Sequence, residues 1–440
     1  MKQPKVQFTP EMRKDYTILI PTMLPMHFKM IAQILTRHGY KAELLENTGP
    51  AVKENGLKYV HNDTCYPALL VIGQFIDAIE SGKYDKHKVA LMLTQTGGGC
   101  RASNYIALLR KALEKAGYGY VPVISLNISG LEKSPGFKIT LPLAKGMIYA
   151  VLYGDLLMNL RNQCRSYEAE PGASDALCEK WTKRLADELF EKRVGYRTAQ
   201  KNYAAIVKEF SALPRRKETK IKVGIVGEIF VKFSPLGNNH LEDFLVSQGA
   251  EVTLPGLLDF CMYCVYNGIA DTALYGINKI KCIGSKMIYR VMQKLQNDLI
   301  RAIRENSDFT PPTPIEHTRS LVKDYIGMGA KMGEGWLLPA EMLELIDSGV
   351  KNIVCTQPFG CLPNHIVGKG MMKPIKERNP NVNIVAIDYD PGTTKINQEN
   401  RIKLMLSCAA ENAGLRPRSS EPAEAAPAIQ PQEEKTPVAV

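Results

Sequence analysis

Four cysteines of this chain stand in or beside turns that contain glycine, proline or polar residues. Cys65 precedes a Tyr-Pro pair, Cys100 follows three consecutive glycines, and Cys355 and Cys361 flank the turn 358–360. Thiolates are the ligands of iron–sulfur clusters, and these ligands can lie far apart in sequence. The intervals of 35, 255 and 6 residues lack the paired spacing of a zinc ribbon. We therefore expect Cys65, Cys100, Cys355 and Cys361 to bind one iron–sulfur cluster, most simply of the 4Fe–4S type, with a double cubane as the alternative.

A structural role is the competing interpretation, because free cysteines are common in protein cores. It applies most to Cys355, which can belong to a buried strand, whereas Cys361 lies in the turn proper. The backbone N–H groups of 97–100 could hydrogen-bond cluster sulfides, but the glycines among them could equally cradle a phosphate. The other six cysteines, including the CxxC pair Cys261 and Cys264, lie in apolar helical or mixed contexts. We expect them to be structural.

Several ionisable side chains accompany these turns. Glu228 follows a predicted strand, Glu334 lies between two glycines, and His365 comes four residues after Cys361. Each could act as a catalytic acid or base, with a solvated or helix-capping role as the alternative. Arg101 directly follows Cys100 and could hold an anionic substrate. We therefore consider Glu228, Glu334 and His365 as candidate catalytic residues and Arg101 as a candidate substrate-binding residue.

Strands and helices that alternate along the chain must position these residues. Short apolar runs predict strands at 16–20, 42–45, 57–60, 89–93, 121–126, 221–226, 251–253, 352–355 and 383–387. Amphipathic segments between them predict helices. This rhythm is typical of doubly wound parallel sheets, whose sites form at the carboxyl ends of the strands. On this prediction the cysteine turns follow the strands at 57–60, 89–93 and 352–355.

The pattern predicts an α/β protein with two Rossmann-like, doubly wound parallel-sheet domains. A first α/β domain is expected at 1–142, a helical connector at 143–216 and a second α/β domain at 217–413. The final segment, 414–440, is rich in proline, alanine and glutamate. Such composition favours disorder.

The composition and charge of the chain indicate which compartment and which partners to expect. The chain has 440 residues, 45% hydrophobic and 23% charged, with ten cysteines and no extended apolar run near its start. We expect a cytoplasmic protein, in which cysteines serve metals or catalysis rather than disulfides. The net charge of +11 is spread along the chain without a nucleic-acid-binding signature, so neither nucleic acid nor membrane is an expected partner.

The sequence lacks the usual nucleotide-binding signatures. It contains no GxxxxGK(S/T) loop, and the glycine-rich stretch 327–333 misses the GxGxxG pattern by one residue. If ATP is used, we expect a separate protein to hydrolyse it.

Taken together, these turns resemble a known family. The chain resembles an uncharacterised domain of CoA enzyme activase-related proteins and, more distantly, the subunits of 2-hydroxyacyl-CoA dehydratases and benzoyl-CoA reductases. The resemblance covers about residues 15–412 and is carried by four stretches: 62–67, 96–105, 357–365 and 388–392.

The resemblance implies two Rossmann-like domains with an oxygen-sensitive cluster between them and a separate ATP-hydrolysing iron–sulfur activator. Three cysteines bind the cluster in the dehydratases, and they match Cys65, Cys100 and one of Cys355 and Cys361. A second cysteine six residues away departs from that pattern, since a fourth thiolate would close the iron site to substrate.

Two hypotheses follow. In the first, the chain is an enzyme component that uses low-potential electrons for radical dehydration or reduction of a small, CoA-linked or other anionic substrate. In the second, it is a non-catalytic iron–sulfur electron carrier or assembly partner of an activase. A homo- or hetero-oligomer is compatible with either.

Overall fold

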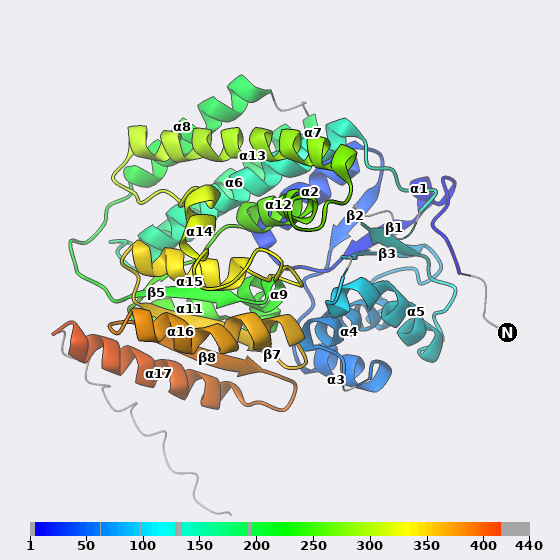
Figure 1. Cartoon of the computed structure of the whole chain (residues 1–440). Coiled ribbons are helices and arrows are strands. Elements are labelled where there is room, and N and C mark those ends of the chain that lie inside the picture. Colours follow the sequence, from blue (N-terminus) through cyan, green and yellow to red (C-terminus); the bar gives the residue numbers. More distant parts are fainter. Residues whose placement is uncertain are drawn as a thin grey trace, which may run out of the picture.

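Two four-stranded sheets, each parallel throughout, form the framework of the protein (Figure 1). The computed structural model describes residues 5–61, 63–96, 98–127, 132, 134–191 and 195–414. The first sheet has the order β2-β1-β3-β4, with strands Lys41–Leu44, Thr17–Ile20, Val89–Thr94 and Val123–Leu126. The second has the order β6-β5-β7-β8, with strands Glu251–Thr253, Lys222–Gly227, Asn352–Pro358 and Asn383–Tyr389. In each sheet the first strand of the unit lies between the second and the third, so the predicted α/β class with two parallel sheets is confirmed.

Helices precede and connect the strands of the first unit. They are α1 (Met12–Asp15), α2 (Pro25–Arg37), α3 (Pro50–Tyr59), α4 (Tyr66–Glu80) and α5 (Tyr105–Lys115), with the short 3-10 helix η1 (Arg101–Asn104) before α5. Nearly every residue of α4 is buried. This fits its position between α3 and the remainder of the unit.

The predicted strand at 57–60 is wrong, because this run forms the end of α3. A proline at the first helical position starts α3, and Leu57 is exposed. Gly56 packs so tightly against α4 that a Cβ there would lie 2.5 Å from the carbonyl oxygen of Leu69. A four-residue apolar run does not distinguish a strand from a helical turn, and helix packing decides the matter here. Cys65 therefore follows a helix rather than a strand.

A helical layer links the two units. It consists of α6 (Leu141–Arg165), α7 (Ala173–Glu191) and α8 (Tyr196–Ser211), which pack on α2, β6 and the later helices (Figure 1). By length and composition α6 alone among the described helices could cross a membrane, but 56% of its most apolar window is buried inside the protein. This burial is the pattern of a core helix.

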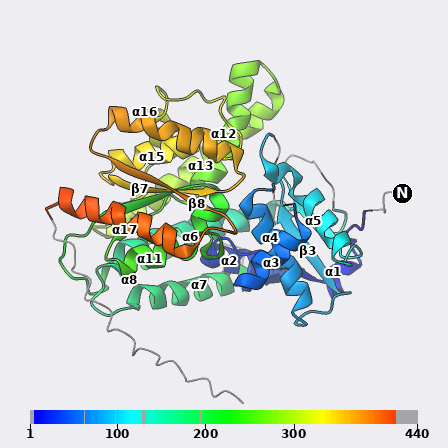
Figure 2. The same cartoon turned by 90° about the horizontal axis from the view of Figure 1, so that it is seen from below.

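Helices on both faces cover the second sheet. Figure 2 shows α15 and α16 on one face and α11 and α17 on the other. The helices of this unit are α9 (Ile229–Phe233), α10 (Pro235–Asn238), α11 (Leu241–Ser247), α12 (Leu257–Tyr275), α13 (Lys279–Asn306), α14 (Ile315–Leu321), α15 (Leu337–Asp347), α16 (Gly370–Arg378) and α17 (Lys395–Asn412), with the π-helical turn η2 (Asn364–Lys369) before α16. The segment expected to be disordered lies, from residue 415, outside the described residues.

Candidate functional site

The loops that carry Cys65 and Cys361 touch backbone to backbone across the two units. The N–H of Tyr66 donates a hydrogen bond to the carbonyl oxygen of Phe359, at 2.9 Å. Gly360 has a φ of +71°, and a Cβ there would lie 3.1 Å from the Cα of Cys65. A glycine is therefore required both by the left-handed backbone and by the close approach of the two loops.

The loop of Cys100 contacts the second unit at a different segment. The N–H of Gly99 donates to the Sδ of Met332, at 3.0 Å. The next residue, Gly333, lies against Pro363, because a Cβ on this glycine would be 2.9 Å from the Cβ of that proline. The segment 332–334 thus lies between the Cys100 loop and the Cys361 loop, and three cysteine loops meet at one junction.

The three thiols at this junction affect one another electrostatically. Burial raises the pKa of Cys65, Cys100 and Cys361, in the case of Cys100 to about 12. Negative charge on Glu228 raises the pKa of all three thiols further, and Cys100 interacts with both of the other cysteines. Without a bound cation, the thiols therefore keep their protons at neutral pH.

Two neighbours partly offset the effect of burial on Cys65. The hydroxyl of Tyr105, the first residue of α5, lies 3.1 Å from its Sγ. The positive charge of Arg101 also lowers the pKa of Cys65, although more weakly than the hydrogen bond. Arg101 itself is exposed. It is therefore placed at the rim of the junction, where a cation can meet an anion from solvent.

Glu228 and Glu334 form a buried carboxyl pair beside the thiols. Glu228 is the N-cap of α9 and accepts a hydrogen bond from the N–H of Val231, while Glu334 accepts one from the N–H of Ile229, both at 2.9 Å. Burial raises the pKa of Glu228 to about 8, and the negative charge of Glu334 adds to the rise. The pKa of Glu334 is also raised, again first by burial. The pair can therefore retain a proton at neutral pH, as a buried acid would.

Cys355 and His365 lie apart from this arrangement. The strand β7 extends three residues further than predicted, so Cys355 is an interior strand residue, fully buried in the apolar core. His365 is exposed near the start of η2, and its Nδ1 hydrogen-bonds with the Nε2 of Gln357. The N–H of His365 donates to the carbonyl oxygen of Cys361 at 3.1 Å, but the structure gives the side chains of Cys355 and His365 no contact with the thiols at 65, 100 and 361. Of the predicted candidates, those three cysteines, Glu228, Glu334 and Arg101 come together.

Sequence reasoning missed three residues around the junction. Tyr105 is one of them, and its position five residues after Cys100 was the available signal. The hydroxyl of Tyr263, on α12, donates to the carbonyl oxygen of Gly333 at 2.9 Å. Cys264 follows it at an exposed position, and the protein atoms packed near its sulfur, followed by the negative charge of Glu334, raise its pKa to about 12. The expectation that Cys264 serves only helix packing therefore needs a direct test.

The junction does not form a metal-binding geometry with the side chains as they stand. Among the described residues, no group of three or more His, Cys, Asp and Glu side chains is arranged to hold a metal ion. The donor chemistry nevertheless fits an iron–sulfur cluster, since three separate loops that each carry a thiol meet at one junction.

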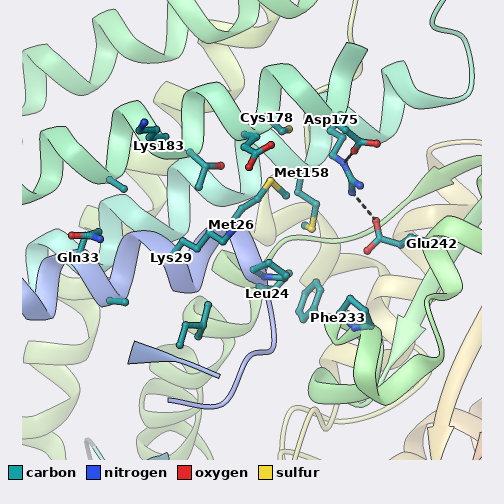
Figure 3. Close-up of a pocket in the computed structure, with 18 of the residues that line it drawn as sticks. Leu24, Met26, Lys29, Gln33, Met158, Asp175, Cys178, Lys183, Phe233 and Glu242 are labelled. Carbon is teal, nitrogen blue, oxygen red and sulfur yellow. Dashed lines mark hydrogen bonds and ion pairs between the residues drawn. The ribbon is translucent and has the colours of Figure 1, made fainter. Parts of the chain in front are cut away.

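A cavity lies elsewhere, between α2, the helical layer and α9–α11 (Figure 3). Its volume is about 720 Å³, within the range of small-molecule sites. Arg161 on its wall pairs with Asp175 and, at 3.9 Å, with Glu242. Phe233, the last residue of α9, also lines the cavity. Because Glu228 caps the other end of α9, this short helix separates the carboxyl pair from the cavity.

Comparison of the sequence with models of known protein families and with curated proteins gives no match.

Proposed function

We propose that this chain is the iron–sulfur component of an ATP-dependent enzyme system. It would receive low-potential electrons from a separate ATP-hydrolysing iron–sulfur activator and use them for radical dehydration or reduction of a small, CoA-linked or other anionic substrate. The observation that carries the proposal is the meeting of Cys65, Cys100 and Cys361 at one buried junction between two α/β units.

The three thiols are the residues that would hold the cluster. A bound cluster would supply one-electron chemistry and, with three protein ligands, an iron open to substrate. Binding would require the thiols to lose their protons, so the raised pKa values make cluster loading strongly dependent on pH. Cys355 would not supply a fourth thiolate, because it lies inside β7.

The surrounding residues have roles that follow from their own chemistry. Glu228 and Glu334 would hold a proton at a buried position beside the thiols and could transfer it as a general acid. Arg101 would attract an anionic substrate to the rim. The aromatic and apolar side chains packed around the junction would exclude water from radical chemistry.

A non-catalytic electron carrier is the second candidate, and one observation favours it. The 720 Å³ cavity is lined by none of the three thiols, so this cavity does not hold a substrate against them. An electron carrier needs no such chamber.

Anaerobic purification tests the proposal. Protein purified without oxygen should be brown, with roughly four irons per chain and matching labile sulfide, and it should bleach in air. Stoichiometric zinc without sulfide would contradict the proposal. The isolated chain should not hydrolyse ATP. Substrate-dependent turnover with a competent activator and ATP would distinguish the enzyme from the carrier.

A further inference from the structure

The cavity between α2, the helical layer and α9–α11 has an apolar floor and a charged rim. Leu24, Met158 and Phe233 line the floor and are exposed by 3%, 2% and 1%. Lys183 and Asp187 on α7 also line the cavity and are exposed, so it opens to solvent. Its volume of about 720 Å³ is that of a small-molecule site. A ligand with an apolar body can therefore enter from solvent and cover this floor.

The wall of this cavity differs in charge from the chain as a whole. Six carboxylates and three cations line it, an excess of three formal negative charges, whereas the whole chain carries a net charge of +11. The carboxylates are Glu43, Asp175, Glu179, Asp187, Glu242 and Asp243, and the cations are Lys29, Arg161 and Lys183. Figure 3 shows Lys183 on the opposite side of the cavity from Glu242. The wall therefore disfavours an anionic ligand and attracts a cation.

The cations that lie among these carboxylates are already paired. Arg161 pairs with Asp175 and, at 3.9 Å, with Glu242. The neighbouring Arg165 pairs with Asp175 at 3.4 Å and with Asp243 at 2.8 Å. Two guanidinium groups thus serve three carboxylates. This cluster therefore has room for one further positive charge, which a ligand could supply.

Glu242 is the member of the cluster with a free oxygen. Its Oε2 accepts a hydrogen bond from the Nδ2 of Asn162 at 3.1 Å, and the contact with Arg161 uses the same oxygen. No described residue forms a hydrogen bond or an ion pair with its Oε1, since the nearby His240 pairs with Asp243. Burial raises the pKa of Glu242, because water is partly removed from its negative charge. A ligand cation would offset this loss of hydration.

A buried hydroxyl on the same wall also lacks a partner. Thr182 lines the cavity and is 5% exposed, and its Oγ1 has no hydrogen-bond partner among the described residues. A primary ammonium has three N–H donors, so it could donate to a hydroxyl oxygen as well as to a carboxylate. A quaternary ammonium has none. The unpartnered oxygens of Glu242 and Thr182 therefore favour a primary amine over other organic cations.

We propose that this cavity binds a primary amine with an apolar body. Its ammonium group lies at the cluster of Arg161, Asp175 and Glu242, and its body covers the apolar floor. The proposal is independent of the iron–sulfur function, because none of the three thiols lines the cavity. The amine also differs in charge from the anionic substrate proposed above, so it is a second small molecule rather than that substrate.

Isothermal titration calorimetry of the anaerobically purified full chain tests the proposal with three probes. Octylammonium, octyltrimethylammonium and octanoate share an apolar body and differ in their head groups. Octylammonium should bind once per chain and at least about tenfold more tightly than octanoate, because the wall is acidic. Non-specific binding to a chain of net charge +11 would favour octanoate instead. Octyltrimethylammonium should bind more weakly than octylammonium, because it lacks N–H donors.

Charge variants assign the binding to this cavity. Glu242→Gln should weaken octylammonium binding about tenfold. The matched control Glu377→Gln, at a 63% exposed carboxylate of α16, should leave it unchanged. Lys183→Glu and Asp187→Lys alter exposed charges at the rim, so both proteins should fold even if Glu242→Gln does not. The first should tighten binding and the second should weaken it, each about threefold.

Three results would overturn the proposal. The first is octylammonium that does not bind at concentrations up to about 1 mM. The second is octanoate or octyltrimethylammonium that binds as tightly as octylammonium. The third is octylammonium binding that none of the folded variants at Lys183, Asp187 and Glu242 changes.

Discussion

Two sets of cysteines in this protein both have raised thiol pKa values but lie in different surroundings. Cys65, Cys100 and Cys361 lie in loops at the junction of the two α/β units, while Cys178 and Cys355 lie within a helix and a strand. Burial raises the pKa of Cys100, Cys178 and Cys355 alike, to about 12. A raised thiol pKa therefore does not identify a functional cysteine.

What differs between the two sets is the kind of element that holds each cysteine. Cys355 lies within β7 and Cys178 within α7, and charged groups act on both thiols, Asp388 on the first and Arg161 on the second. The junction thiols lie in loops, beside a carboxyl pair, a tyrosine hydroxyl and the Arg101 cation. Convergence of loops from separate units, rather than burial, distinguishes the candidate ligands.

The largest expected effect is on iron content. Replacement of Cys65, Cys100 or Cys361 with serine should each remove most of the roughly four irons, because three thiolates are needed to hold the cluster. Cys178→Ser should leave iron unchanged, as a buried cysteine of the other set. Iron and sulfide should be measured after anaerobic reconstitution. Full iron retention in all three junction variants would remove the basis of the proposed function.

The next largest effect is on how the folding stability of the metal-free protein depends on pH. The folded pKa of Glu228, about 8, lies above its ordinary value of 4.5. Its contribution to stability is therefore complete below pH 4.5 and is lost as the pH rises through 8, an effect of about 3–5 kcal/mol. Glu228→Gln removes this titration. The stability of this variant relative to wild type should therefore rise between pH 4.5 and 8.

Urea unfolding of both proteins between pH 4.5 and 8.5 measures this difference. The control Glu377→Gln replaces an exposed carboxylate and should follow the wild-type curve. If the unfolding free energies of wild type and Glu228→Gln change in parallel with pH, this carboxyl is not held neutral.

A smaller effect is expected where the cysteine loops touch. Gly360→Ala introduces a Cβ 3.1 Å from the Cα of Cys65, at a left-handed φ of +71°. Gly82→Ala has a φ of +76° but meets nothing within 4 Å. Both should lose about 1–2 kcal/mol of unfolding free energy from the backbone, and Gly360→Ala should lose about 1 kcal/mol more through crowding. Chemical denaturation measures both losses. If Gly360→Ala and Gly82→Ala lose the same unfolding free energy, the loops of Cys65 and Cys361 do not meet this closely.

The smallest effect is expected for Cys355→Ser. Iron should be retained, because Cys355 lies inside β7, while the buried hydroxyl should lower the unfolding free energy by about 1–2 kcal/mol. Iron analysis and urea unfolding of the same preparation give both quantities. Large iron loss in a folded variant would instead make Cys355 a fourth ligand and close the cluster to substrate.

The sequence by itself determined the parallel α/β framework. Strands such as Thr17–Ile20, Val89–Thr94 and Asn383–Tyr389 were predictable because their apolar runs are short, continuous and bounded by polar residues. The sequence also indicated Cys65, Cys100 and Cys361 as candidates, since turns containing glycine or proline precede or follow each of them.

Only the tertiary structure decided which of these residues meet. The run at 57–60 became the end of α3 because Gly56 allows close packing on α4, and no local pattern encodes that contact. The approach of Gly360 to Cys65, and of Met332 to Gly99, joins residues hundreds of positions apart. Local propensity reflects interactions between near neighbours in sequence. The junction depends instead on how two independently formed sheets and a helical layer pack together.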